Sequence, residues 1–174
     1  DTTGGLKGKK RLMTERVVRS PMLAYWPGKV PAGAHSEPIS AFWAFLPTMA
    51  ELAGEPINGR TDGLSMLPTL RGEFEQQKQH RYLYWELYEG RPNCGVRMGK
   101  WKGIALDRRK GAEIELYDLA ADEAEERNAA YQYPEVVDQN RKAMLEAHEP
   151  SSFWDKNNKP LYNAQAASDL NAVT

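Results

Sequence analysis

The sequence predicts an α/β fold in which a small antiparallel sheet packs on a C-terminal helix. Two observations carry this prediction: a series of short alternating apolar and polar segments over residues 81–118, and two segments with helical spacing at 40–54 and 134–148. Short strands joined by short turns are typical of an antiparallel meander. The 174 residues, of which 41% are hydrophobic, suffice for one domain with a core or two small layers.

The first 80 residues predict one strand and two helices. The apolar run PMLAYWPG at 21–28 reads as a short strand ended by a Pro-Gly turn. In SAFWAFLPTMAELAG, Pro47 is tolerated only in the first helical turn, so the helix should begin near residue 44 or 45 and stop at Gly54. Ala44 then stands at the N-cap, where it costs roughly 1 kcal/mol relative to Asp or Ser. TDGLSMLPTLRG predicts a tight turn at Asp62-Gly63 and then a short helix.

Residues 81–118 predict three or four strands. RYLYWELYE forms one, GVRMGKWKGIAL forms two joined at Gly99-Lys100, and AEIELYDL forms another with Ile114 and Leu116 on one face. Asp122 and Glu125 have the spacing of a capping box, which predicts a short helical turn after them.

The last predicted element is a helix in PEVVDQNRKAMLEAHEP, with Pro134 at its start. Its predicted inner face consists of Val137, Met144, Leu145 and His148. The polar, aperiodic tail after Trp154 predicts either an extended arm on the surface or disorder.

Charge and cysteine content exclude some classes of protein. The net charge of −1 argues against a general nucleic-acid or membrane-surface binder, and no apolar run reaches transmembrane length. Cys94 is the only cysteine, so no internal disulfide can form. Because it lies beside turn residues and far from any His in the sequence, we expect an inert thiol at a strand start.

Five motifs occur in an order typical of one family. They are GLKGKKRLMTERVVRSPMLAYWPGKVPAG, FLPTMAELAG, DGLSMLPTLRG, VRMGKWKGI and ELYDLAADEAEERNAA, with LEAHEPSSFW at the end. From about residue 4 to residue 154 the chain resembles the C-terminal part of a type I sulfatase. This is the formylglycine-dependent arylsulfatase family within the alkaline-phosphatase superfamily.

The resemblance implies a division of the chain and a location for it. Residues 1–80 would form the end of the large α/β catalytic domain, residues 81–150 the C-terminal antiparallel-sheet subdomain with its helix, and residues 151–174 an extended tail. The family is periplasmic, secreted or lysosomal. The implied substrate is a sulfated carbohydrate or an aryl sulfate, with no nucleic acid and no membrane as partner.

The resemblance places the sulfate-contacting lysine of the family at Lys10. A sulfate ester is a fixed anion, and a rigidly held ammonium can stabilise charge as it moves onto the leaving oxygen. Without the resemblance, a solvated basic loop is the usual interpretation of such a charge run. Glu15 and Arg19 match family positions with a mainly structural role, and Lys7 matches a basic position. His80 is a further candidate for substrate binding, with an exposed loop histidine as the alternative.

The rest of the family's chemistry is absent from this sequence. The formylglycine arises in a Cys/Ser-x-Pro/Ala-x-Arg motif that does not occur here, and the calcium ligands and catalytic histidines precede the matched segment. We therefore expect no metal site in this chain and no hydrolysis by the chain alone. A missing N-terminal sulfatase domain, in the same or a separate chain, would supply formylglycine and calcium.

The sequence also departs from the family pattern. Arg16 and Val17 replace two glycines, and Ala44 and Thr14 replace an Asp and an aromatic residue. These departures indicate either degeneration of the site or an imperfectly determined sequence. The alternatives are therefore a non-catalytic binding or structural module (a degenerate sulfatase or a proteolytic fragment) and a related phosphoesterase.

Two further residue groups have a functional and a structural interpretation. Four aromatic residues suggest a sugar-stacking face, although strand spacing favours packing. They are Trp85, Tyr88, Trp101 and Tyr117. The polar group of Asp122, Glu125 and Asn128 resembles a metal or acid cluster, but capping and turn chemistry explains it better.

Overall fold

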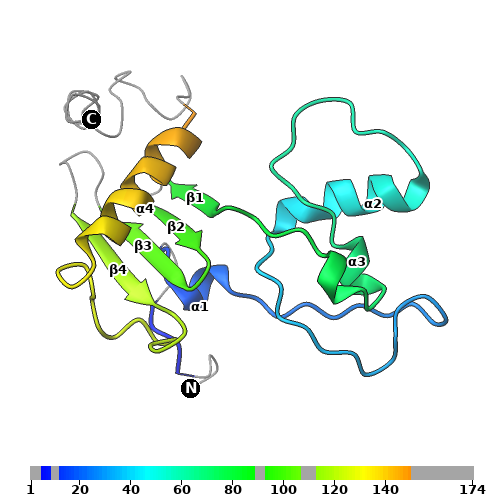
Figure 1. Ribbon diagram of the computed structural model, residues 1–174, viewed down its shortest axis with the longest axis horizontal. Helices are drawn as coiled ribbons and strands as arrows, with labels where there is room; N and C mark the ends of the chain where they lie inside the picture. The colour runs from blue at the N-terminus through cyan, green and yellow to red at the C-terminus, as the bar shows by residue number, and fades with distance from the viewer. Residues whose placement is uncertain (1–4, 9–11, 89–92, 107–112, 150–174) are drawn as a thin grey trace. The chain divides into compact units, whose positions relative to one another are not determined.

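The computed structural model describes residues 5–8, 12–88, 93–106 and 113–149. It divides the chain into two compact units (Figure 1). Unit 1 comprises Asp1–Ser20 together with Tyr84–Thr174, and unit 2 comprises Pro21–Leu83. Unit 1 is therefore discontinuous in sequence, with unit 2 inserted between its two parts. The tail at 151–174 lies outside the described residues.

A four-stranded sheet forms the centre of unit 1. Its strands are β1 (Leu83–Leu87), β2 (Asn93–Met98), β3 (Trp101–Ala105) and β4 (Ile114–Asp118), and they lie side by side in chain order. Strand β3 pairs antiparallel with both β2 and β4. Gly99 adopts a φ of 56° between β2 and β3, a conformation that favours glycine in a tight hairpin. The predicted meander is confirmed.

Helix α4 (Pro134–Ala147) covers one face of this sheet (Figure 1). Pro134 starts the helix, as predicted, and Met144 is buried against the Sγ of Cys94, with 3.7 Å between the two sulfur atoms. Asn140, which the apolar pattern does not include, is also buried and lies against Gly103 of β3. The face of α4 that contacts the sheet is therefore partly polar at its centre.

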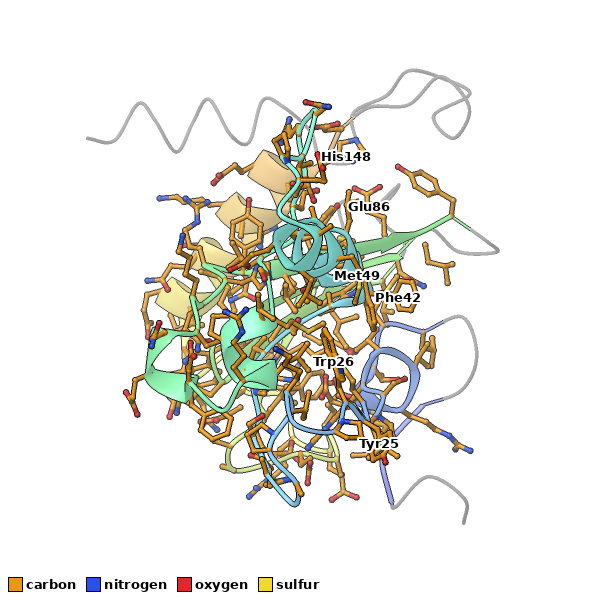
Figure 2. All side chains as sticks on the ribbon, turned by 90° about the vertical axis from the view of Figure 1, so that its right-hand side faces the viewer. Tyr25, Trp26, Phe42, Met49, Glu86 and His148 are labelled. Carbon is orange, nitrogen blue, oxygen red and sulfur yellow. The ribbon has the colours of Figure 1, made fainter. Side chains whose placement is uncertain are left out.

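The end of α4 is tied to strand β1. His148 Nδ1 lies 2.6 Å from Glu86 Oε1, and both side chains are largely buried. Figure 2 labels both residues. His148 thus belongs to the inner side of the helix, as predicted, but its contact there is with a carboxylate.

The N-terminal segment lies on the opposite face of the sheet. Its short helix α1 spans Glu15–Val18. Met13 forms a buried cluster with Ile104 and Tyr117, against which four partly buried apolar side chains pack. They are Val18, Trp85, Leu87 and Leu119. Because side chains alternate along a strand, Lys102 and Ile104 point to this face while Gly103 points to α4.

Unit 2 consists of short helices joined by loops. They are η1 (Phe42–Ala44), α2 (Phe45–Ala53), α3 (Leu67–Leu70) and η2 (Phe74–Gln76). Helix α2 begins and ends as predicted: Ala44 is its N-cap without a side-chain hydrogen bond, and Gly54 ends it with a φ of 73°. Thr48 Oγ1 accepts a hydrogen bond from Met66 N at 2.9 Å, which joins α2 to the start of α3.

Two local predictions in unit 2 are wrong. Residues 21–28 form no strand, because no strand among the described residues pairs with them. Residues 61–66 contain no turn at Asp62-Gly63. Gly63 instead lies against η1, where a Cβ would stand 2.3 Å from the carbonyl oxygen of Trp43, so glycine serves close approach rather than a turn.

No helix within the described ranges combines the length and the apolar character needed to cross a bilayer.

Candidate functional site

A buried cluster of charged side chains lies between the N-terminal segment and the sheet of unit 1. Lys102 Nζ donates to Glu15 Oε1 at 2.7 Å and lies 3.1 Å from Glu125 Oε1. Arg97 Nη1 approaches Glu15 Oε2 at 3.5 Å. The side chains of Lys102 and Glu125 are 0% exposed, and that of Glu15 is 1% exposed. Two cations therefore face two carboxylates, and of the four side chains only that of Arg97, at 25% exposed, is in contact with solvent to any extent.

Burial shifts the pKa values of Glu125 and of the neighbouring Tyr117. It raises the pKa of Glu125 above the ordinary 4.5, and the attraction of Lys102 offsets the rise only in part. The nearby hydroxyl of Tyr117, which donates to Glu115 Oε2 at 2.9 Å, has its pKa raised by burial and then by the Glu115 carboxylate. Both side chains are buried, and an uncompensated charge is costly in such surroundings.

Lys7, which precedes the basic residues 9–11, contacts the same cluster. Lys7 Nζ donates to the carbonyl oxygen of Glu125 at 2.9 Å and lies 5.3 Å from the ring centroid of Tyr117. A Cβ on Gly8 would stand 1.9 Å from Thr14 Oγ1, so only glycine fits there. Arg16 Nη1 also donates to the carbonyl oxygen of Gly8 at 3.1 Å. Residues 7–8 and 14–16 are thus held together.

The capping box predicted at Asp122 and Glu125 does not form. Asp122 accepts hydrogen bonds from the backbone N–H groups of Glu126 and Arg127, which is turn chemistry. Glu125 instead adopts a φ of 56°, and its Oε2 accepts the N–H of Glu15 at 2.8 Å. No helical turn follows. The long-range partners of Glu125 replace the local capping bond.

Arg19 and Asn128 also have structural partners. Arg19 forms an exposed ion pair with Glu123. Asn128 Oδ1 accepts hydrogen bonds from the backbone N–H groups of Leu116 and Ala130. The metal-cluster interpretation of Asp122, Glu125 and Asn128 therefore gains no support from their contacts.

Of the two predicted site residues, His80 is among the described residues and Lys10 is not. Lys10 lies outside the described residues, as do Lys9 and Arg11. His80 belongs to unit 2, just before β1. Burial lowers the pKa of His80 below its ordinary 6.5, although the Asp62 carboxylate acts to raise it. Its Nε2 is buried and has no hydrogen-bond partner among the described residues.

The described residues do not fit a metal or a thiol nucleophile. In the part of the chain that the structure describes, no group of three or more His, Cys, Asp or Glu side chains is arranged to hold a metal ion. We therefore assign no calcium ligand to these residues. Cys94 is 0% exposed at the second residue of β2, in agreement with the predicted inert thiol.

The four aromatic residues do not gather as a stacking face. Trp85 packs against the cluster that contains Tyr117, and Tyr117 is itself 3% exposed. Trp101 packs on Tyr133, with 4.7 Å between ring centroids, and the hydroxyl of Tyr88 donates to Glu86. The packing interpretation fits these contacts better.

Comparison with known proteins defines the class. The family model described as N-sulphoglucosamine sulphohydrolase, C-terminal, matches residues 8–150, and the chain belongs to this family as a C-terminal part of a sulfatase. Human arylsulfatase A is 31% identical over 163 residues, which cover 92% of this chain and 28% of that protein. The chain therefore spans less than a third of this relative.

Solved structures agree on the fold. The structure of BT4656 in complex with its substrate D-glucosamine-2-N,6-O-disulfate is 25% identical, with a TM-score of 0.59 over 78% of this chain and 28% of that one. The crystal structure of Ps i-CgsB is 22% identical, with a TM-score of 0.70 over 97% of this chain and 37% of that one. The α/β fold of a C-terminal sulfatase part is thereby confirmed.

Two departures from the family pattern, Arg16 and Val17, are accommodated without backbone strain. Among the described residues other than glycine, only Glu125 has a positive φ, so Val17 does not adopt the conformation that a family glycine would allow. Val17 lies in α1 and is 40% exposed. Arg16 uses its side chain to bind Gly8. These two substitutions leave the segment anchored.

Sequence reasoning missed Lys102 and Arg97 as members of the cluster. Their signal was weak: VRMGKWKGI places both on one face of a hairpin, which only the register reveals. The available hint was Lys102 itself, a lysine inside a predicted strand, together with Glu15, a glutamate that matches the family motif.

Proposed function

We propose that this chain contributes to the hydrolysis of sulfate esters, with a sulfated carbohydrate as the substrate class. The observation that carries the proposal is the match of residues 8–150 to the C-terminal sulfatase family. The glucosamine disulfate bound by a structural relative supports a sulfated sugar. Residues 1–80 would complete the large catalytic domain and residues 81–150 would form the subdomain. We also assign the family's periplasmic, secreted or lysosomal location to the protein that contains this chain.

In this proposal, Lys10 contacts the sulfate group. Its ammonium would neutralise charge on the ester oxygens, an effect that grows as the bond to the leaving oxygen breaks. His80 would contact the substrate through Nε2, and burial, which lowers the pKa of His80, favours the neutral imidazole. The nucleophile and calcium belong to the part of the protein that precedes the matched region.

The test uses the protein that contains this chain and the preceding region. Lys10→Ala should reduce turnover of an aryl sulfate by orders of magnitude, since the lost charge stabilisation is worth roughly 3 kcal/mol. Lys9→Ala, its neighbour, is the control and should turn over at nearly the normal rate. Equal rates for both variants would remove Lys10 from the site.

An exposed apolar surface on unit 2 supports the need for that preceding region. Leu23 is 98% exposed, Tyr25 92% and Phe42 84%, with Leu46 and Met49 of α2 more than half exposed. Figure 2 shows Tyr25, Trp26, Phe42 and Met49 of this unit. Large apolar side chains that are exposed together often mark an interface. Since the chain spans 28% of human arylsulfatase A, we assign the surface to the missing N-terminal sulfatase domain.

The surface can be tested by association. Phe42→Ser combined with Met49→Ser should weaken binding of the isolated chain to the separately produced N-terminal region in a pull-down. Tyr131→Ser, which removes an exposed aromatic side chain of unit 1 (92% exposed), should not. Equal binding by both variants contradicts the assignment.

A non-catalytic module is the second candidate, favoured by Arg16 and Val17 where the family has glycines. A Cys/Ser-x-Pro/Ala-x-Arg motif upstream supports the sulfatase, and its absence supports the module. A related phosphoesterase would prefer an aryl phosphate over an aryl sulfate in the same assay.

A further inference from the structure

The backbone of the apolar segment Met22–Trp26 in unit 2 has unused hydrogen-bonding groups. Its N–H groups donate to none of the described residues. The segment begins after Pro21, which has no N–H, and ends at the turn of Pro27-Gly28, where the Trp26 carbonyl oxygen accepts two backbone N–H groups from beyond the turn. Backbone groups of a folded protein are nearly always paired, so this stretch of backbone is open to a partner.

The side chains of the segment are apolar and exposed in both alternating sets. Leu23 is 98% exposed and Tyr25 92%, while Met22 and Trp26 of the other set are 47% and 48% exposed. Figure 2 labels Tyr25 and Trp26. Because the side chains of a strand alternate between two faces, a strand at this position would present apolar groups on both. Such runs are typical of strands that are covered on both faces in α/β sheets.

The described residues offer this segment no sheet to join. Their one sheet consists of β1 to β4, and Met22–Trp26 is not part of it. The chain covers 28% of human arylsulfatase A and 37% of the Ps i-CgsB chain. Most of a protein of this kind therefore lies outside this chain, which leaves ample length for a further sheet.

We propose that Met22–Trp26 adds as a strand to the edge of a β-sheet in the missing N-terminal sulfatase domain. The partner is an edge strand, whose backbone groups pair with those of the segment. The inference rests on the proposed function, which assigns the exposed surface of unit 2 to that domain, and it goes further by stating how the backbone is recognised. Packing of side chains alone would bury the N–H groups without a partner, which is costly.

The first experiment measures amide hydrogen exchange in the chain alone and in the complete protein. The amides of Leu23, Ala24 and Tyr25 should exchange in the chain alone at nearly the rate of an unstructured peptide. In the complete protein, at least every second one should exchange about a hundredfold more slowly or less. Ile104 in β3 should be protected in both and is the control. Fast exchange at all three amides in the complete protein overturns the proposal.

The second experiment removes single N–H groups from the segment. Adjacent N–H groups of a strand point to opposite edges, so Leu23→Pro or Ala24→Pro, or both, should weaken association with the separately produced N-terminal region by about tenfold or more. Neither should lower the Tm of the chain alone, because no hydrogen bond is lost there. Leu23→Ala controls for the lost side chain, and Ser36→Pro for proline in an exposed loop of unit 2. Association of both proline variants at control strength contradicts strand pairing.

Two further outcomes separate this inference from its alternatives. Protection of Leu23 and Tyr25 that rises with the concentration of the chain alone would assign the segment to a second copy, and would overturn the proposal. Turnover of an aryl sulfate by the complete protein tests the function independently. Protection without turnover supports the added strand and refutes the proposed function, whereas turnover without protection refutes the added strand alone.

Discussion

Lys102 Nζ lies 2.7 Å from Glu15 Oε1, and neither side chain is reached by solvent beyond 1% of its surface. The two residues are 87 positions apart in the chain. Their contact joins the N-terminal segment to the third strand of the sheet. Removing one partner leaves a buried charge that cannot be hydrated. In an exposed pair, the remaining charge would be hydrated by the solvent.

We expect Lys102→Met to lower the free energy of unfolding by about 3–5 kcal/mol, because the carboxylates of Glu15 and Glu125 lose their shared cation. Urea unfolding followed by tryptophan fluorescence measures the change. Lys100→Met removes an exposed lysine two residues away and should cost no more than about 1 kcal/mol. Similar losses for both variants would contradict the buried cluster.

Close packing of α4 on β3 gives a second prediction. A Cβ on Gly103 would stand 2.7 Å from Asn140 Oδ1, so Gly103→Ala should destabilise the protein by about 1–3 kcal/mol. Asn140→Ala in the same chain should recover part of this loss, because Oδ1 and Cγ are then gone. Gly95→Ala is the matched control: its nearest contact is Met13 Cβ at 3.1 Å, and its cost should be smaller. Additive losses in the Gly103–Asn140 pair would refute the clash.

The pair of Lys100 and Asp118 predicts a pH dependence. Lys100 Nζ donates to Asp118 Oδ2 at 2.6 Å, and this hydrogen bond lowers the pKa of Asp118 below its ordinary 3.8. A carboxyl with a lowered pKa adds stability above the unfolded pKa and loses it as the pH falls through the folded pKa. The difference in Tm between the wild type and Asp118→Asn should therefore shrink between about pH 5 and about pH 2.

Two controls accompany that measurement. Glu126→Gln replaces an exposed carboxylate on the same loop and should show no comparable trend. High salt should reduce the Asp118 effect, because the pair is at the surface. A difference in Tm that grows on acidification would contradict the assigned pair.

Burial of Cys94 predicts a slow thiol. Its side chain is 0% exposed and packs on Met144, so a disulfide reagent such as DTNB should react only when the sheet opens. The reaction should become fast in urea, at the same midpoint as the fluorescence change. Rapid labelling of the native protein would show that β2 is not covered as described.

Local patterns predicted the elements whose structure depends on near neighbours. Pro47 and Gly54 bound α2 because backbone chemistry alone limits where a helix starts and stops. Gly99 marked the hairpin between β2 and β3 for the same reason. Five ordered motifs then identified the family, although each motif is short.

Long-range contacts decided what local patterns could not. The spacing of Asp122 and Glu125 favours a capping box, yet a backbone N–H 110 residues away takes the carboxylate of Glu125. The apolar run at 21–28 suggests a strand, but a strand also needs a partner, and none lies among the described residues. In the candidate site, Lys102 was missed because its partners are distant in sequence.

The insertion of unit 2 into unit 1 has a consequence for biosynthesis. Glu15 is translated 110 residues before Glu125, and the whole of unit 2 is made in between. At ribosomal speeds this delay is roughly 6–20 s. Glu15 is thus among the earliest parts of unit 1 to be made, yet its N–H can reach Glu125 only after the rest of the sheet has been made, so this contact should report completed folding of the unit.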